Sequence, residues 1–116
     1  KFLYLILMKS VSFRGTSLVD LRQFPDSAKR EAGYQIDKVQ NGEEPDNWKP
    51  MKTIGPGVNE IRIADEGDAY RVLYVAKFED TVYILHCFKK QTQKTSEADK
   101  KIAVKRYKSL LRELQK

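Results

Sequence analysis

The sequence predicts an α+β domain in which a curved antiparallel sheet of about four strands carries two N-terminal helices and one C-terminal helix. Apolar residues recur at helical spacing in two regions, one early in the chain and one at its end. Between them lie three strand-like runs with short, turn-forming connections, which is typical of an antiparallel meander. A chain of 116 residues is large enough for one modest core.

Residues 1–10 are expected to be an N-terminal extension or the start of the first strand, and residues 11–116 a single domain. The apolar start is too short to span a bilayer, and no small-residue cleavage site follows it. Met8 is a candidate initiator, with residues 1–7 upstream of it. Residues 11–13 form the first strand candidate.

Two helices are predicted next. Ser17 followed by Asp20 is a capping pair for the first helix, and Pro25 suits the first turn of the second. Asn41 and Gly42 end the second helix. Its apolar stripe consists of residues three and four apart, namely Ala28, Ala32, Ile36 and Val39.

The middle of the chain predicts a loop and then the meander. Residues 43–57 are expected to be a loop that Trp48 anchors against the core; a base-stacking platform is the alternative role for Trp48. Three strands then follow at residues 58–63, 70–77 and 82–88, separated by turns at 64–68 and 78–80.

The last helix begins at Ser96, because Asp99 three residues later completes a capping pair. Its apolar stripe is predicted to contain Ala103, Tyr107, Leu110, Leu111 and Leu114. Basic residues fall largely on the other side, at Lys101, Lys105, Lys108 and Arg112.

Positive charge is concentrated in the last quarter of the chain. Residues 1–85 contain 12 Lys/Arg and 13 Asp/Glu, a net of −1, whereas residues 86–116 contain 10 and 3, a net of +7; together they give +6. A localised positive field indicates a polyanionic partner. A solvated basic helix that only favours solubility is the alternative. Residues 86–95, which hold three lysines and no carboxylate, are the clearest candidate for binding a phosphate backbone.

Several chemistries are excluded by composition. With one cysteine, Cys87, and one histidine, His86, the chain has no internal disulfide and no single-chain zinc site, and it suits a reducing cytosol. Cys87 is interpreted as a core residue rather than a nucleophile. His86 suits an acid–base role and a hydrogen-bonded core position equally. No phosphate-binding glycine loop is present, and no metal or other cofactor is predicted.

Arg62 and Arg71 lie within predicted strands, where an unpaired arginine is costly to bury. Each is therefore either ion-paired, with Glu60, Asp65 or Asp68 as partners, or placed to meet a phosphate. Composition alone favours ion pairing. If RNA is cleaved by its own 2′-hydroxyl, fixed cations can stabilise the pentavalent phosphate, and a lysine of lowered pKa can help to protonate the leaving group.

Several motifs recur along the chain in an order and spacing typical of one protein family. They are Glu60-Ile-Arg-Ile63, Ala69-Tyr-Arg-Val-Leu-Tyr74, residues 82–95, Trp48-Lys-Pro-Met-Lys52 with Ile54-Gly-Pro-Gly57, and Phe13-Arg-Gly-Thr-Ser-Leu18 with residues 20–22 and 24–25. Together they resemble the RelE/HigB toxin superfamily, with its phage-derived HigB-like branch the nearest.

The resemblance implies a microbial-ribonuclease-like fold and the toxin of a type II toxin–antitoxin system, a cytoplasmic, ribosome-dependent mRNA endoribonuclease. It also implies an antitoxin partner with a helix-turn-helix, a homodimer or a hetero-oligomer with that antitoxin, and no membrane.

The resemblance also implies site residues. Arg71 matches the family's sheet arginine, and Arg62 a basic catalytic position on the preceding strand. His86 and Lys90 complete the predicted catalytic set, and Lys52, Lys77, Lys89 and Lys94 are predicted to bind RNA.

Two positions depart from the family pattern. Relatives often use a tyrosine near the C-terminus, for which Tyr107 is the nearest candidate, although its helical stripe indicates core packing. Glu60 stands where some relatives have a second lysine. Two alternatives therefore stay open: a ParE-like inhibitor of DNA gyrase and a phage-derived RNA-binding protein without catalysis.

Overall fold

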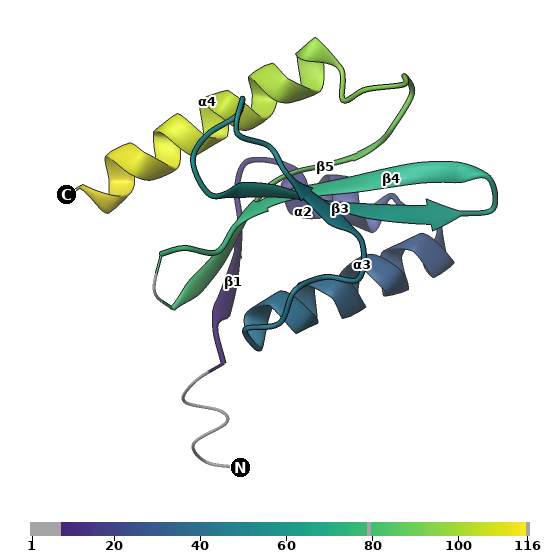
Figure 1. Ribbon diagram of the computed structural model, residues 1–116, viewed down its shortest axis with the longest axis horizontal. Helices are drawn as coiled ribbons and strands as arrows, with labels where there is room; N and C mark the ends of the chain where they lie inside the picture. Colours follow the sequence, from purple (N-terminus) through teal and green to yellow (C-terminus); the bar gives the residue numbers. More distant parts are fainter. Residues whose placement is uncertain (1–7, 79, 116) are drawn as a thin grey trace.

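The computed structural model describes residues 8–78 and 80–115, and within them a five-stranded sheet lies between two helical layers (Figure 1). Helices α2 and α3 cover one face of the sheet and α4 covers the other. The predicted α+β class is confirmed, with one strand more than expected. In chain order the elements are β1 (Ser10–Phe13), α2 (Ser17–Arg22), α3 (Asp26–Gln40), β2 (Trp48–Pro50), β3 (Val58–Asp65), β4 (Asp68–Val75), β5 (Thr81–Lys89) and α4 (Glu97–Leu114).

The strands are ordered β1-β5-β4-β3-β2. The predicted meander of β3, β4 and β5 is confirmed, and its first turn is a two-residue connection in which Glu66 and Gly67 both have positive φ (49° and 84°). This is the backbone geometry of a type I′ hairpin. β1 begins at Ser10 and pairs with β5 in parallel, so the sheet is mixed rather than wholly antiparallel. Residues 1–7, the expected extension, lie outside the described residues.

The fifth strand, β2, lies inside the segment that was expected to be a loop. Trp48 pairs with Ile61 and Pro50 with Asn59 on β3. Proline cannot donate to a ladder and is confined to edge strands, which is the position of β2. Three residues that include a proline are too few to show an alternating pattern, so the sequence did not reveal this strand.

The core between the sheet and α3 depends on two alanines. Ala28 and Ala32 are fully buried, so the helix backbone approaches the strands closely. Ile61 and Ile84 fill the opposite side of this interface. Cys87 belongs to the same core, and burial raises the pKa of its thiol to about 12, which agrees with a structural rather than a nucleophilic role.

The starts of α2 and α3 each differ by one residue from the prediction. α2 begins at Ser17, so Thr16 occupies the cap and its hydroxyl donates to Asp20 Oδ2 at 2.8 Å. The Ser17 hydroxyl instead donates to the Ile84 carbonyl, because Ser17 is buried against β5. Pro25 is the cap residue of α3 rather than part of its first turn.

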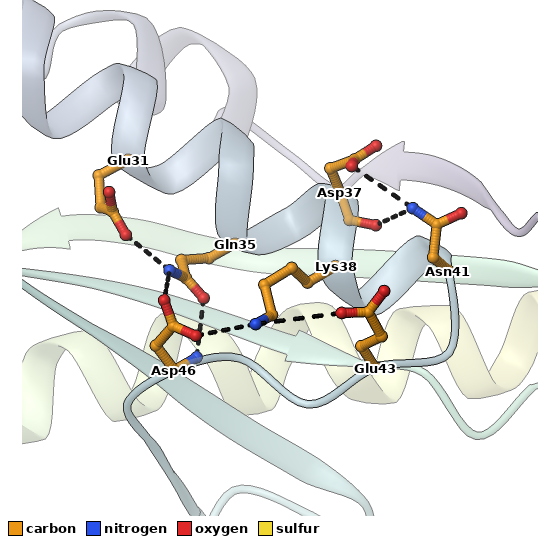
Figure 2. Close-up of polar contacts among 7 residues, drawn as sticks. All are labelled: Glu31, Gln35, Asp37, Lys38, Asn41, Glu43 and Asp46. Carbon is orange, nitrogen blue, oxygen red and sulfur yellow. Dashed lines mark hydrogen bonds and ion pairs between the residues drawn. The ribbon is translucent and has the colours of Figure 1, made fainter.

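A polar network fastens the chain after α3 to that helix (Figure 2). The Gln35 amide nitrogen donates to Glu31 and Asp46, and the Asp46 backbone N–H donates back to Gln35 Oε1 at 2.8 Å. Lys38 forms ion pairs with Asp46 at 2.8 Å and with Glu43 at 4.0 Å. Because Asp46 lies two residues before β2, this network sets where that strand begins.

Helix α4 begins at Glu97, and its cap is the predicted residue Ser96, whose hydroxyl accepts from the Asp99 backbone N–H at 3.1 Å. Tyr107 is buried, and its hydroxyl donates to the Pro56 carbonyl at 2.8 Å. Gly55 is required beneath this ring, since a Cβ there would lie 2.3 Å from Tyr107 Cε2. Leu114, predicted to lie on the apolar stripe, is 44% exposed at the last turn. No helix within the described residues is long and apolar enough to cross a bilayer.

Candidate nucleic-acid site

Arg62 and Arg71 lie directly opposite each other on β3 and β4. Opposed residues of an antiparallel pair project from the same face, here the face that carries α4. Like charges in that arrangement are destabilising. The sheet therefore needs an anion close to this pair.

Glu60 supplies that anion. Its Oε1 lies 3.6 Å from Arg71 Nε, and both side chains are almost completely buried. Its Oε2 accepts a hydrogen bond of 2.6 Å from Thr95, which belongs to the loop before α4. Burial lowers the pKa of Arg71, an effect that Glu60 opposes and Arg62 reinforces. Of the three acidic partners considered for Arg71, Glu60 is thus the one in contact.

Arg62 differs from Arg71 in having no neutralising partner. Its side chain is half-buried, and its Nε is buried without a hydrogen-bond partner. Among the described carboxylates, none lies within 4.0 Å of its guanidinium. Arg62 is consequently the sheet cation whose charge is available to an anionic ligand.

Lys90 joins these groups from the end of β5. Its backbone N–H donates to the Ala69 carbonyl at 2.7 Å, which extends the β4–β5 ladder by one residue. By the alternation of strand residues, its side chain shares the face of Arg62 and Arg71. The pKa of Lys90 is lowered, first by partial burial and then by the positive charges of Arg71 and Arg62. Three cations and one carboxylate therefore form a cluster, Glu60–Arg62–Arg71–Lys90, with a net charge of +2.

His86 lies beside this cluster in a hydrogen-bonded core position. Its Nε2 is 2.7 Å from Asp99 Oδ1 at the start of α4, and its ring stacks on Phe88 with centroids 4.9 Å apart. The His86 Nδ1 atom is buried and has no hydrogen-bond partner. The structure therefore shows His86 joining α4 to the sheet, the second of the two roles that its sequence position suits.

The four lysines predicted to bind RNA lie on different parts of the surface. Lys52 and Lys94 line one groove of about 480 Å³. Lys89 is paired with Tyr70, so it projects from the opposite sheet face, where it lies 3.4 Å from Asp68. Lys77 follows the far end of β4, with its Nζ 5.3 Å from the Phe78 ring centroid. Only the first two lysines lie together.

Sequence reasoning missed Lys49 and Thr95. Lys49 pairs with Glu60 across β2 and β3, and its charge contributes to the lowered pKa of Lys90. Thr95 is buried in a polar segment that gave no sign of burial. Trp48, by contrast, pairs with Ile61, so it lies on the opposite face of the sheet from Arg62 and Arg71. This position favours its loop-anchoring role. Within the described residues, no three His, Cys, Asp or Glu side chains are grouped to hold a metal.

Comparisons with known proteins identify a family and solved structures with a similar fold. Residues 19–108 match the profile of a family described as phage-derived protein Gp49-like (DUF891). A double arginine-to-alanine mutant of the E. coli toxin RelE, solved in the free state, superposes with a TM-score of 0.61 at 12% identity, covering 89% of this chain and 98% of that one. The RelBE2 toxin–antitoxin complex of Mycobacterium tuberculosis gives a TM-score of 0.48 at 21% identity, over 72% and 99%. No curated protein sequence matches significantly.

Proposed function

Because this chain belongs to the phage-derived Gp49-like family, and because its fold is that of the RelE toxin, we propose that it is the toxin of a toxin–antitoxin pair and cleaves mRNA on the ribosome. The observation that carries the proposal is the cluster Glu60–Arg62–Arg71–Lys90 on one face of a rigid sheet. An excess of fixed cations on a sheet is suited to a phosphodiester, whose charge increases in the transition state. An antitoxin that binds the toxin and keeps it inactive follows from the same proposal.

In this mechanism the substrate's 2′-hydroxyl oxygen attacks the adjacent phosphorus, and the bond from phosphorus to the 5′-oxygen breaks. Arg62 binds a non-bridging oxygen, and the buried positive charge of Arg71 opposite it helps to stabilise the pentavalent intermediate. The Lys90 ammonium gives its proton to the departing 5′-oxygen, and the 2′-hydroxyl proton passes to water. A lowered pKa makes Lys90 a stronger acid than an ordinary lysine, which suits this transfer.

The remaining groups position these three cations. Glu60 holds Arg71 against the sheet, and Thr95 holds Glu60. His86 supports Phe88 by stacking and is fixed by Asp99, so we assign it a positioning role rather than contact with RNA. Its buried Nδ1 agrees with this role. No step requires a metal.

The test is expression from a tightly repressed promoter, with growth and the 5′ ends of cellular mRNA as readouts. Wild type should stop growth and produce new mRNA ends that depend on translation. Arg62→Ala, Arg71→Ala and Lys90→Met should each reduce cleavage by about 100-fold or more, the size of effect typical when one electrostatic or acid–base group is lost. Arg30→Ala, an exposed arginine on α3, is the matched control.

Cleavage that persists unchanged in all three site variants, while the control behaves as wild type, would overturn the assignment of the site. Growth that stops with signs of DNA damage and intact mRNA would overturn the nuclease assignment and indicate an inhibitor of DNA gyrase on the same fold. Co-purification with the product of an adjacent helix-turn-helix reading frame tests the antitoxin separately.

A further inference from the structure

Two lysine-lined grooves meet at Thr53 and Lys100, on the face of the sheet that carries α4. The first, of about 480 Å³, is lined by Lys49, Lys52 and Lys94. The second, of about 590 Å³, runs along α4 and is lined by Lys101, Lys105 and Lys108. Thr53 and Lys100 line both, so the grooves are continuous. The chain after β2, which contains Thr53, passes beside α4 in Figure 1.

The charge along this path is predominantly positive. Residues 100–112 contain six Lys or Arg and no Asp or Glu. Lys101, Lys105 and Lys108 follow one another at intervals of four and three, so they project from one side of the helix. All three are exposed, although their stems border Val104 in the groove. Glu97, at the first turn, pairs with Lys100 at 3.5 Å and is the one acidic residue that lines either groove.

The path begins at the proposed cleavage site. Lys49 lies opposite Glu60 in the sheet register and is close enough to affect the pKa of Lys90. Thr95, which lines the first groove, donates its hydrogen bond to the same Glu60. A polyanion bound at Arg62 and Lys90 therefore meets Lys49 next, and the two grooves beyond it.

We propose that these grooves form one track, from Lys49 through Lys100 to Lys108, that holds the single-stranded RNA flanking the scissile phosphate. Lysine ammonium groups on flexible stems suit phosphates without reading base sequence. The track contains no aromatic ring in either lining, so it would bind the backbone rather than stack bases. This inference rests on the proposed function for its direction, because the cleavage site is taken as one end of the track.

The test compares RNAs of two lengths by fluorescence anisotropy on purified full-length protein. An oligonucleotide of about 4 nucleotides spans the cluster alone, and one of about 12 extends along the track. The variant is Lys101→Glu with Lys105→Glu. The matched control is Arg22→Glu with Arg30→Glu, which changes the net charge equally on exposed residues of α2 and α3, across the sheet.

The α4 variant should bind the longer RNA about tenfold more weakly and show a smaller salt dependence, because two phosphate contacts are lost. The short RNA should bind both variants alike. Equal weakening of the longer RNA by both variants would show an effect of net charge alone and overturn the track. Unchanged RNA binding together with lost binding of a poly-glutamate peptide would also overturn it, in favour of an acidic protein partner.

Failure of the track and failure of the proposed function are distinguishable. If wild type cleaves mRNA but the α4 variant binds the longer RNA normally, the track is wrong and the nuclease assignment stands. If the α4 variant binds the longer RNA more weakly although wild type cleaves no mRNA, the track stands as a binding surface without catalysis.

Discussion

The Thr95 hydroxyl donates a 2.6 Å hydrogen bond to Glu60 Oε2 across 35 positions of sequence, and both residues are buried. This bond ties the loop before α4 to the centre of the sheet. It also occupies the carboxylate oxygen that Arg71 does not contact. The stability of the cation cluster therefore depends on a neutral residue outside the sheet.

Thr95→Val should destabilise the protein by about 1–3 kcal/mol, because a buried carboxylate oxygen loses its donor while the side-chain volume is kept. Urea denaturation followed by circular dichroism measures this. Thr53→Val, at an exposed position, is the control and should change stability by less than about 0.5 kcal/mol. Equal effects of the two substitutions would mean that the Thr95 bond contributes nothing.

Replacing each of the two sheet arginines should lower the protein's stability by a different amount, although both are proposed to act on RNA. Arg71→Ala leaves Glu60 buried without its cation, so it should cost about 3 kcal/mol or more. Arg62→Ala removes a like charge opposite Arg71 and should cost less than about 1 kcal/mol. The same denaturation experiment separates them. A larger loss for Arg62→Ala would contradict the assignment of Glu60 to Arg71.

The pKa of Lys90 should depend on the charge of its neighbours. Its lowered pKa arises from burial and from Arg71 and Arg62, so Arg62→Ala should move the pKa back toward the ordinary lysine value. Because the lowered pKa penalises the charged form in the folded state, cationic Lys90 costs stability below its folded pKa, and the cost disappears as the pH rises through the ordinary value. NMR titration of the Lys90 side chain measures the shift. Arg30→Ala should leave it unchanged, and a further fall in Arg62→Ala would contradict the electrostatic cause.

Local patterns were sufficient for the fold's main elements. The helical stripes containing Ala32 and Tyr107 and the capping pair at Ser96 predicted α3 and α4, because each signal lies within one or two turns. The short connections predicted the meander. The parallel pairing of Ser10 with Thr81 had no local signal, since it joins residues that are distant in sequence.

The site was predictable only where it depends on strand alternation. Arg62 and Arg71 were identified as strand residues, and their register makes them neighbours. Lys89 and Lys90 are adjacent in sequence but project to opposite faces, and the register is shifted between Leu73 and Tyr74. Such an irregularity reverses which side chains share a face, and it leaves no mark in the sequence.

Asp46 should make the protein's stability sensitive to acid. Its pKa is lowered first by the hydrogen bond from Lys38 and then by that from Gln35, the contacts drawn in Figure 2. A carboxyl group with a lowered folded pKa stabilises the fold above its unfolded value and loses this contribution as the pH falls through the folded value. Wild type should therefore be more stable than Asp46→Asn at neutral pH.

That difference should persist down to about pH 3.8, the ordinary aspartate value, and close below it. Thermal unfolding at a series of pH values measures it. The control is Asp37→Asn, on α3, whose side chain contacts Asn41 rather than a lysine. Because the Asp46 contacts fix the chain just before β2, hydrogen exchange in Asp46→Asn should also rise at Lys49. Equal stability of wild type and Asp46→Asn at every pH would show that Asp46 acts through its backbone N–H alone.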